Sequence, residues 1–158
     1  MCIKIFQFID VRKNCLENKN FLETLLYGKV KEGINIIGIC KCKKCKAFNQ
    51  KIAIPLEGKL ILNMKEDDES LLCPLCEKVV TVLTVGFNRC KYLIRGSVIE
   101  EEGSKKNFEI SGMSPYNVQY FSPDKCGLVK FSNLIIIVDI ILSPLIENNS
   151  NIFKYLSY

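Results

Sequence analysis

The sequence of 158 residues contains no histidine. This absence excludes a Ser–His or Cys–His nucleophilic pair, a histidine general base and a histidine metal ligand. The phosphate-binding loop with a glycine five residues before a Gly-Lys pair is also absent, because Ala53 and Glu23 occupy the positions that this glycine would need. No catalytic constellation is visible in the sequence, and we therefore expect a protein that is not an enzyme.

The sequence also lacks a signal peptide and an apolar run long enough to cross a membrane. Charged and polar residues interrupt its first ten positions, and no small-residue cleavage site follows. The apolar run at 134–146 is shorter than the about 20 residues of a spanning helix, and it contains Asp139. Its isoleucines predict a buried strand instead, with Ile136 and Val138 on the core side. We expect an intracellular protein, cytoplasmic or nuclear, that does not bind a membrane.

The composition predicts one globular domain with a basic surface. The 22 lysines and arginines exceed the 17 aspartates and glutamates, which gives a net charge of +5, and 48% of the residues are hydrophobic. We expect a single β-rich domain over residues 1–146, followed by a polar, mobile tail over residues 147–158.

Local patterns predict one short helix near the N-terminus and short strands elsewhere. Leucines at helical spacing, with Asn20 as a cap, predict the helix over residues 20–27. The strands are predicted over residues 3–9, 33–40, 52–54, 79–87, 91–94 and 108–110. Gly58 is expected to open a hairpin return after the third of these strands, and Arg89 to lie in a turn between the fourth and fifth. Residues 111–127 contain two prolines, and they predict an irregular surface connection.

The cysteines are the most informative feature of the sequence. They number nine, and an odd number fits a closed set of disulfides poorly, whereas clustered cysteines in a reducing compartment are typical of metal sites. One pair is unambiguous, Cys73-Pro-Leu-Cys76. In the other turn, either Cys40 or Cys42 pairs with Cys45, and Cys42 gives the simpler spacing. Two such turns, each leading into a strand, predict a tetrahedral Zn²⁺ site of four thiolates.

These patterns define an α+β, β-rich fold class with antiparallel, zinc-ribbon-like hairpins and a short N-terminal helix. A cross-braced pair of zinc ions would need eight ligands, and the seven cysteines from Cys40 to Cys126 do not supply them. We therefore expect one zinc ion per chain. Cys90 is interpreted as a buried thiol, and Cys2, Cys15 and Cys126, which are isolated in the sequence, as structural or incidental cysteines.

Lysines surround the first cysteine turn. They are Lys41, Lys43, Lys44, Lys46 and Lys51. Such a basic patch binds phosphate in nucleic-acid-binding proteins, but ammonium groups also balance the charge of a four-thiolate zinc site. Acidic residues at 66–69 are expected in the same module, and aromatic residues that stack bases are sparse here. The sequence thus predicts a zinc-stabilised binding module for a protein partner, and nucleic-acid binding through these lysines is the alternative.

Five short motifs occur together between residues 27 and 97. They are Gly33-Ile-Asn-Ile36, Gly38-Ile-Cys40, Cys45-Lys-Ala-Phe-Asn49, Cys73-Pro-Leu-Cys76, and Gly86-Phe87 followed by Cys90 and Tyr92. In this combination they resemble a four-cysteine, zinc-ribbon-like module of uncharacterised fungal and protist proteins. The resemblance implies that Cys40 pairs with Cys45 and that Cys42 is an extra cysteine. Modules of this kind are sometimes fused to ubiquitin-like or other interaction domains, which implies a role in the ubiquitin pathway as a third hypothesis.

Overall fold

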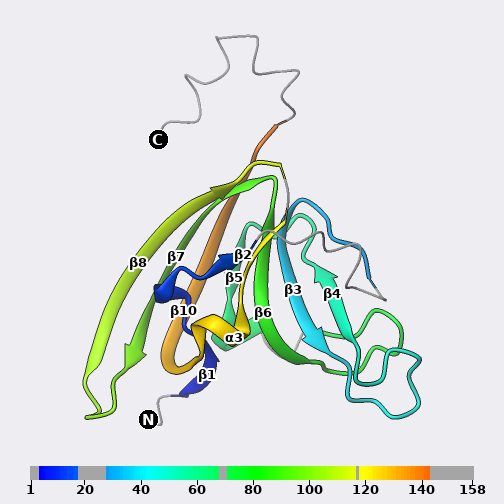
Figure 1. The fold of residues 1–158 in the computed structure, drawn as a ribbon, viewed down its shortest axis with the longest axis horizontal. Helices are drawn as coiled ribbons and strands as arrows, with labels where there is room; N and C mark the ends of the chain where they lie inside the picture. Colours follow the sequence, from blue (N-terminus) through cyan, green and yellow to red (C-terminus); the bar gives the residue numbers. More distant parts are fainter. Residues whose placement is uncertain (1–3, 18–27, 68–70, 117, 143–158) are drawn as a thin grey trace.

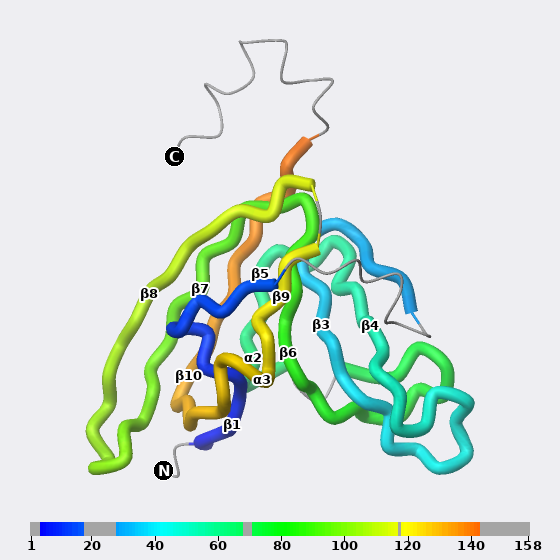
Figure 2. Tube along the Cα trace, in the orientation of Figure 1, coloured from blue at the N-terminus to red at the C-terminus, as the bar shows by residue number. Residues whose placement is uncertain are grey.

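The chain folds into two five-stranded β-sheets. The computed structural model describes residues 4–17, 28–67, 71–116 and 118–142, and Figures 1 and 2 show how they are arranged. Sheet A contains, in spatial order, β1 (Phe6–Ile9), β10 (Leu128–Ile140), β7 (Cys90–Ile99) and β8 (Lys105–Ser114), and β5 (Ile61–Asn63) also pairs with β10. Sheet B contains, in spatial order, β2 (Leu16–Glu17), β9 (Gln119–Phe121), β6 (Thr81–Asn88), β3 (Gly33–Ile39) and β4 (Lys51–Pro55).

The β-rich part of the predicted fold class is confirmed, because most of the described elements are strands. Every pair of these strands is antiparallel. In the described ranges the helical segments are single turns that connect strands. They are η1 (Val11–Lys13), α2 (Met64–Asp67) and α3 (Pro123–Cys126). The helix predicted over residues 20–27 and the tail predicted over residues 147–158 lie outside the described residues.

The strand predicted within the apolar run at 134–146 is confirmed as the end of β10, the longest strand of sheet A. Ile136 and Val138 are buried and Asp139 is exposed, as the alternation predicts. This part of β10 pairs with β7 along one edge and with β5 along the other. No helix among the described residues has the length and apolar character needed to span a membrane.

The core lies where the two sheets meet. The ring of Phe87 in β6 stacks on that of Tyr92 in β7 with 4.1 Å between centroids, and it contacts the ring of Phe121 in β9 edge-on at 6.3 Å. Phe87 therefore joins a residue of sheet A to a residue of sheet B. Buried aliphatic residues from both sheets complete this cluster. They are Ile34, Ile36 and Val85 of sheet B and Ile94, Leu134 and Ile136 of sheet A.

Two of the predicted connections join strands that belong to different sheets. The strand after Gly58 does not return along β4 but pairs with β10, because the buried Leu62 belongs to the core beside sheet A. The turn predicted at Arg89 (φ 50°) is confirmed as the connection between β6 and β7, and the two strands enter different sheets. In both cases the alternation of apolar residues predicts which face of a strand is buried, but it does not predict which strand it pairs with.

The segment 111–127 is more regular than predicted. It contains the end of β8, the short strand β9 and the single turn α3. Pro123 is the first residue of α3, where the missing N–H group of a proline does no harm. A proline that favours a loop in the sequence therefore begins a helix in the structure.

Candidate metal centre

The first cysteine turn, residues 40–50, connects β3 to β4. Cys40 directly follows β3, and its carbonyl oxygen accepts a hydrogen bond from the Asn49 N–H at 2.8 Å. Inside the turn, the Cys45 N–H donates to the Cys42 carbonyl oxygen at 3.0 Å, and the Phe48 N–H donates to the Cys45 carbonyl oxygen at 3.0 Å. Asn49 closes the turn in the left-handed conformation (φ 58°), which asparagine tolerates well. These bonds fix Cys40 at the start of the loop and Cys45 in its middle.

The second cysteine turn, residues 71–80, precedes β6. Leu72 and Val79 face each other across an antiparallel bridge, and the Cys73 N–H donates to the Lys78 carbonyl oxygen at 2.8 Å. The Glu77 N–H donates to the Cys73 carbonyl oxygen at 2.8 Å, with Glu77 itself at φ 59°. The turn thus presents Cys73 and Cys76 on one side.

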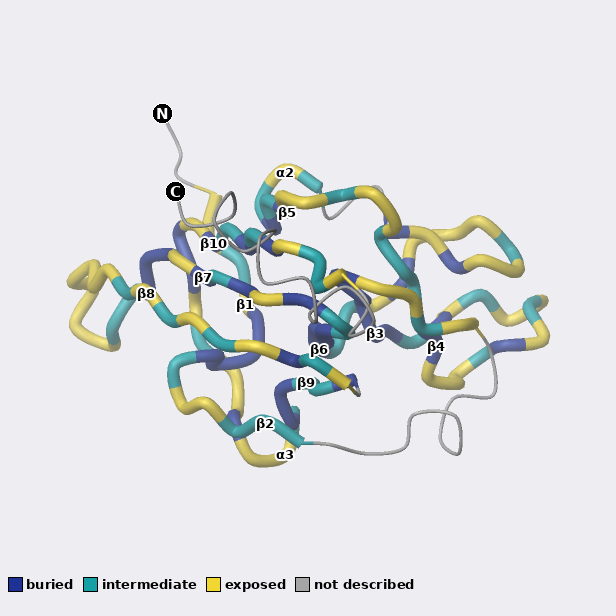
Figure 3. Tube along the Cα trace, turned by 90° about the horizontal axis from the view of Figure 1, so that it is seen from above, coloured by how far each residue is buried: buried dark blue, intermediate teal, exposed yellow. Residues whose placement is uncertain are grey.

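Strand pairing brings the two turns together. Ile39 at the end of β3 pairs with Thr81 at the start of β6, so the loop that leaves β3 lies beside the loop that enters β6. In Figure 1 they are the cyan and green loops at the lower right, and Figure 3 shows exposed loops at the same end of the molecule. The two turns are 31 residues apart in sequence when Cys42 and Cys73 are compared, and only the sheet makes them neighbours.

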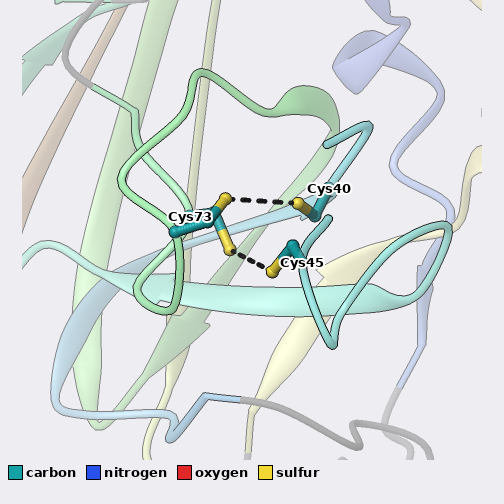
Figure 4. Close-up of side chains that lie close together, drawn as sticks. Cys40, Cys45 and Cys73 are labelled. Atoms are coloured by element: carbon teal, nitrogen blue, oxygen red, sulfur yellow. Dashed lines mark hydrogen bonds between the residues drawn. The ribbon is translucent and has the colours of Figure 1, made fainter. Parts of the chain in front are cut away.

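Four sulfur atoms meet between the turns. The Sγ atoms of Cys40, Cys45, Cys73 and Cys76 all lie within 4.8 Å of one another. The Sγ atoms of Cys40 and Cys76 are 3.7 Å apart, and those of Cys45 and Cys73 are 3.9 Å apart, with three of these side chains labelled in Figure 4. These distances are far longer than the about 2.05 Å of a disulfide. The four cysteines are therefore positioned to hold a metal ion.

The thiol pKa values of Cys40, Cys73 and Cys76 are shifted, and the direction of the shift differs among them. Burial raises the pKa of the Cys40 thiol. Burial acts in the same direction at Cys73, but hydrogen bonds from the backbone of Leu75 and Cys76 outweigh it and lower the pKa of that thiol. At Cys76 a backbone hydrogen bond from Lys78 lowers the pKa, whereas burial and the neighbouring sulfurs raise it to about 12. Four thiolates this close would repel one another. A bound cation would favour the thiolates because its positive charge offsets this repulsion.

Backbone donors and partial burial complete the centre. The Ala47 N–H donates to the Cys45 Sγ at 3.4 Å. Cys40 and Cys73 are each 1% exposed, whereas Cys45 and Cys76 are half-buried. One side of the cluster thus faces the core and the other side faces solvent.

Cys42, the alternative to Cys40, lies outside the four-sulfur cluster. It is half-buried, and its backbone carbonyl accepts the hydrogen bond that shapes the first cysteine turn. The structure therefore groups Cys40, and not Cys42, with Cys45 and the second pair. Cys90 is a buried thiol, as predicted, and burial raises its pKa to about 11.

Cys15 and Cys126 are isolated in the sequence but are neighbours in the structure. The buried Cys126 thiol donates to the Cys15 carbonyl oxygen at 3.9 Å, and burial, with the nearby Cys15 thiol, raises the Cys126 pKa to about 11. The two cysteines are 111 positions apart, and the pairing of β2 with β9 brings them together. No spacing in the sequence signals this contact.

The predicted lysine patch is exposed along its whole length. Its members are Lys41, Lys43, Lys44, Lys46 and Lys51. The Lys41 Nζ donates to the Asn49 side-chain oxygen at 3.2 Å, and no salt bridge to any of the five lysines is formed within the described ranges. The acidic residues expected beside them lie in part elsewhere, since Asp67 belongs to α2, next to β5 and β10, and pairs with Lys59 at 3.1 Å.

In comparisons with known proteins, no family model, curated sequence or solved structure matches this chain. The centre is therefore interpreted from its own geometry.

Proposed function

We propose that Cys40, Cys45, Cys73 and Cys76 bind one zinc ion, and that the chain is a zinc-stabilised module that binds a protein partner. The observation that supports this proposal best is the spacing of the sulfurs. Zinc binds thiolates at about 2.3 Å in a tetrahedron, whose edges are then about 3.8 Å long. Two sulfur–sulfur distances of the cluster, 3.7 and 3.9 Å, lie on either side of that value.

The position of the centre in sheet B supports a zinc-ribbon-like role for it. One pair of cysteines lies on the turn between β3 and β4, and the other pair lies on the hairpin-like turn that leads into β6. Because β6 pairs with β3, an ion between the turns cross-links three neighbouring strands at one end of the sheet. We prefer zinc to an iron–sulfur cluster because paired cysteine turns on hairpins are the usual frame of a structural zinc site.

A four-thiolate site supports a structural role and argues against catalysis at the metal. Four protein ligands fill the tetrahedral coordination of zinc, so no position is left for a water molecule or a substrate. We therefore propose that the ion orders the two cysteine turns and that the turns present their outer side chains to a partner. An intracellular location, where thiols stay reduced, is part of this proposal.

Cobalt substitution of the full chain tests the proposed ligand set. Co²⁺ in a tetrahedral site of four thiolates has intense visible and sulfur-to-metal charge-transfer absorption, and both change when one sulfur is lost. We expect the Cys40→Ser variant to lose the four-sulfur spectrum and the Cys42→Ser variant to keep it. The opposite result would show that the shorter Cys-x-x-Cys turn holds the metal.

The exposed lysines favour nucleic-acid binding as a second candidate function. Five ammonium groups on the first cysteine turn and at the start of β4, without a salt bridge among the described residues, are available to phosphates. In that case the affinity for single- or double-stranded DNA or for RNA falls steeply with salt, and Lys43→Ala and Lys44→Ala reduce the slope. A protein partner that also buries apolar surface is less sensitive to salt.

A further inference from the structure

The outer side of the second cysteine turn is apolar. Leu72 and Val79 are directly opposite each other in an antiparallel bridge, and residues in this position point to the same face. Leu72 is 38% exposed and Val79 is 59% exposed, while Leu75, between the two cysteines of the turn, is 51% exposed. Their backbone neighbours Leu71 and Val80 are buried, so the hairpin has an inner and an outer apolar face. The outer face exposes aliphatic side chains to water, and burying them against a partner is favourable.

The neighbouring first cysteine turn is basic. Lys43 and Lys44 lie between Cys42 and Cys45, and Lys46 follows directly, with all three side chains exposed. The sulfurs of the two turns lie within 4.8 Å of one another, so the turn that carries these lysines lies beside the apolar turn, and Figure 4 shows the two turns meeting at their cysteines. Glu77 and Lys78 are the charged residues of the second turn, and both are exposed. The surface thus combines aliphatic side chains with an excess of positive charge.

We infer that the two turns form a docking surface for an acidic segment of a partner protein that carries aliphatic or aromatic side chains. This turn surface consists of Leu72, Leu75, Val79, Lys43, Lys44 and Lys46. The inference rests on the proposed function, because the zinc ion is what holds the two turns in one arrangement. Carboxylates of the partner pair with the lysines and set orientation and association rate, while its apolar side chains cover the leucines and the valine.

The side chains of the turn surface favour a peptide over a nucleic acid. Single-stranded nucleic acids are bound by aromatic rings that stack on bases, in addition to positive charge. The large exposed apolar residues of the two turns are leucine and valine, which do not stack on bases. Phe48, the aromatic residue of the first turn, is half-buried and bridges to Cys40. Phosphates alone would use the lysines and leave the aliphatic side chains uncovered.

Fluorescence anisotropy with three labelled probes tests the inference on the full-length, zinc-loaded protein. The first probe is a 16-residue peptide that alternates Asp or Glu with Leu or Phe. The second has the same acidic residues, with every Leu and Phe replaced by Ser. The third is a 20-nucleotide oligothymidine. We expect the first peptide to bind at least about tenfold more tightly than the other two probes at physiological salt.

Variants with matched controls locate the binding site. We expect Leu75→Ser with Val79→Ser to weaken binding of the first peptide at least about fivefold, and Lys43→Glu with Lys44→Glu at least about tenfold. The apolar control is Leu128→Ser, in β10, which is 66% exposed. The charge control is Lys105→Glu with Lys106→Glu, in β8, where both lysines are exposed. Both controls should bind the peptide as the parent protein does.

The zinc content of every sample separates failure of the inference from failure of the proposed function. If the protein holds one zinc ion and the two peptides bind equally, or neither binds, the docking surface is wrong and the metal centre stands. Tighter binding of the oligothymidine, with loss in the lysine variant, would replace the inference with the nucleic-acid function. A protein that binds no zinc would overturn both proposals.

Discussion

Sheet A and the two cysteine turns differ in what stabilises them. In sheet A, β7 pairs with β8 and with β10 over nearly their full lengths, and Phe131, Leu134 and Ile136 are fully buried. Hydrophobic burial and long ladders of backbone hydrogen bonds therefore stabilise this sheet.

The cysteine turns contain isolated bridges and tight hydrogen-bonded loops in place of long ladders. Most of their side chains are exposed, and Glu77 has a positive φ of 59°, a conformation that costs about 1–3 kcal/mol in a residue other than glycine. Their inner side consists largely of cysteines. From this difference we propose that the apolar core determines the fold and that a metal ion held by the four cysteines would stabilise the turns.

The largest effect is expected from a charge in the core of sheet A. Ile136 is fully buried, so Ile136→Asp would place a carboxylate without a partner in an apolar environment. We expect a loss of more than about 5 kcal/mol in the free energy of unfolding, seen as failure to fold. Asp139→Ala, on the exposed face of the same strand, is the control and should fold normally.

A smaller and more local effect is expected from the loss of one sulfur. Cys73→Ser should abolish zinc binding and remove the stabilisation by metal, about 4 kcal/mol when free zinc is about a thousand times its Kd. Hydrogen exchange should show loss of protection in residues 71–80 and continued protection in β7 and β10. Loss of protection in all strands at once would mean that the two regions are not independent.

A packing contact of sheet A gives an intermediate test. Gly112 in β8 pairs with Tyr92 in β7, and a Cβ atom at Gly112 would overlap the Tyr92 hydroxyl and ring. The ring cannot move freely because it stacks on Phe87. We expect Gly112→Ala to cost about 1–3 kcal/mol in chemical denaturation. Tyr92→Leu should relieve most of that cost in the double variant, and Ser111→Ala, at an exposed position of β8, should be neutral.

The smallest effect is expected from an ion pair at the edge of sheet B, and it depends on pH. Hydrogen bonds from Lys125 and Tyr120 lower the pKa of Glu17 from 4.5 to about 2. A lowered pKa in the folded state adds stability that is present above pH 4.5 and is lost as the pH falls toward 2. The urea midpoint of the parent protein should exceed that of Glu17→Gln at pH 6, and the two should converge near pH 2. A difference that persists at pH 2 would contradict the assigned cause.

The sequence is sufficient to predict the two cysteine turns and the buried face of β10. Short-range spacing carries both features, since Cys73 and Cys76 are three positions apart and Ile136 and Val138 alternate along one strand. The choice between Cys40 and Cys42 depends on more than spacing. Cys40 is fixed at the end of β3 by the hydrogen bond from Asn49, whereas Cys42 contributes its backbone carbonyl to the turn.

Local sequence patterns do not predict which distant segments of the chain come into contact. The pairing of β5 with β10 and the contact between Cys15 and Cys126 both join segments far apart in the chain. Alternating apolar residues specify which face of a strand is buried, but many partners satisfy the same alternation. Which strand pairs with which therefore depends on how all the buried side chains pack together in the core.

The zinc content of the full-length protein, purified without added metal and measured by elemental analysis, tests the central claim most directly. The proposed site of Cys40, Cys45, Cys73 and Cys76, whose four sulfurs lie within 4.8 Å of one another, predicts one zinc ion per chain, released when the thiols are modified. Two zinc ions per chain, or none, would contradict the proposed centre.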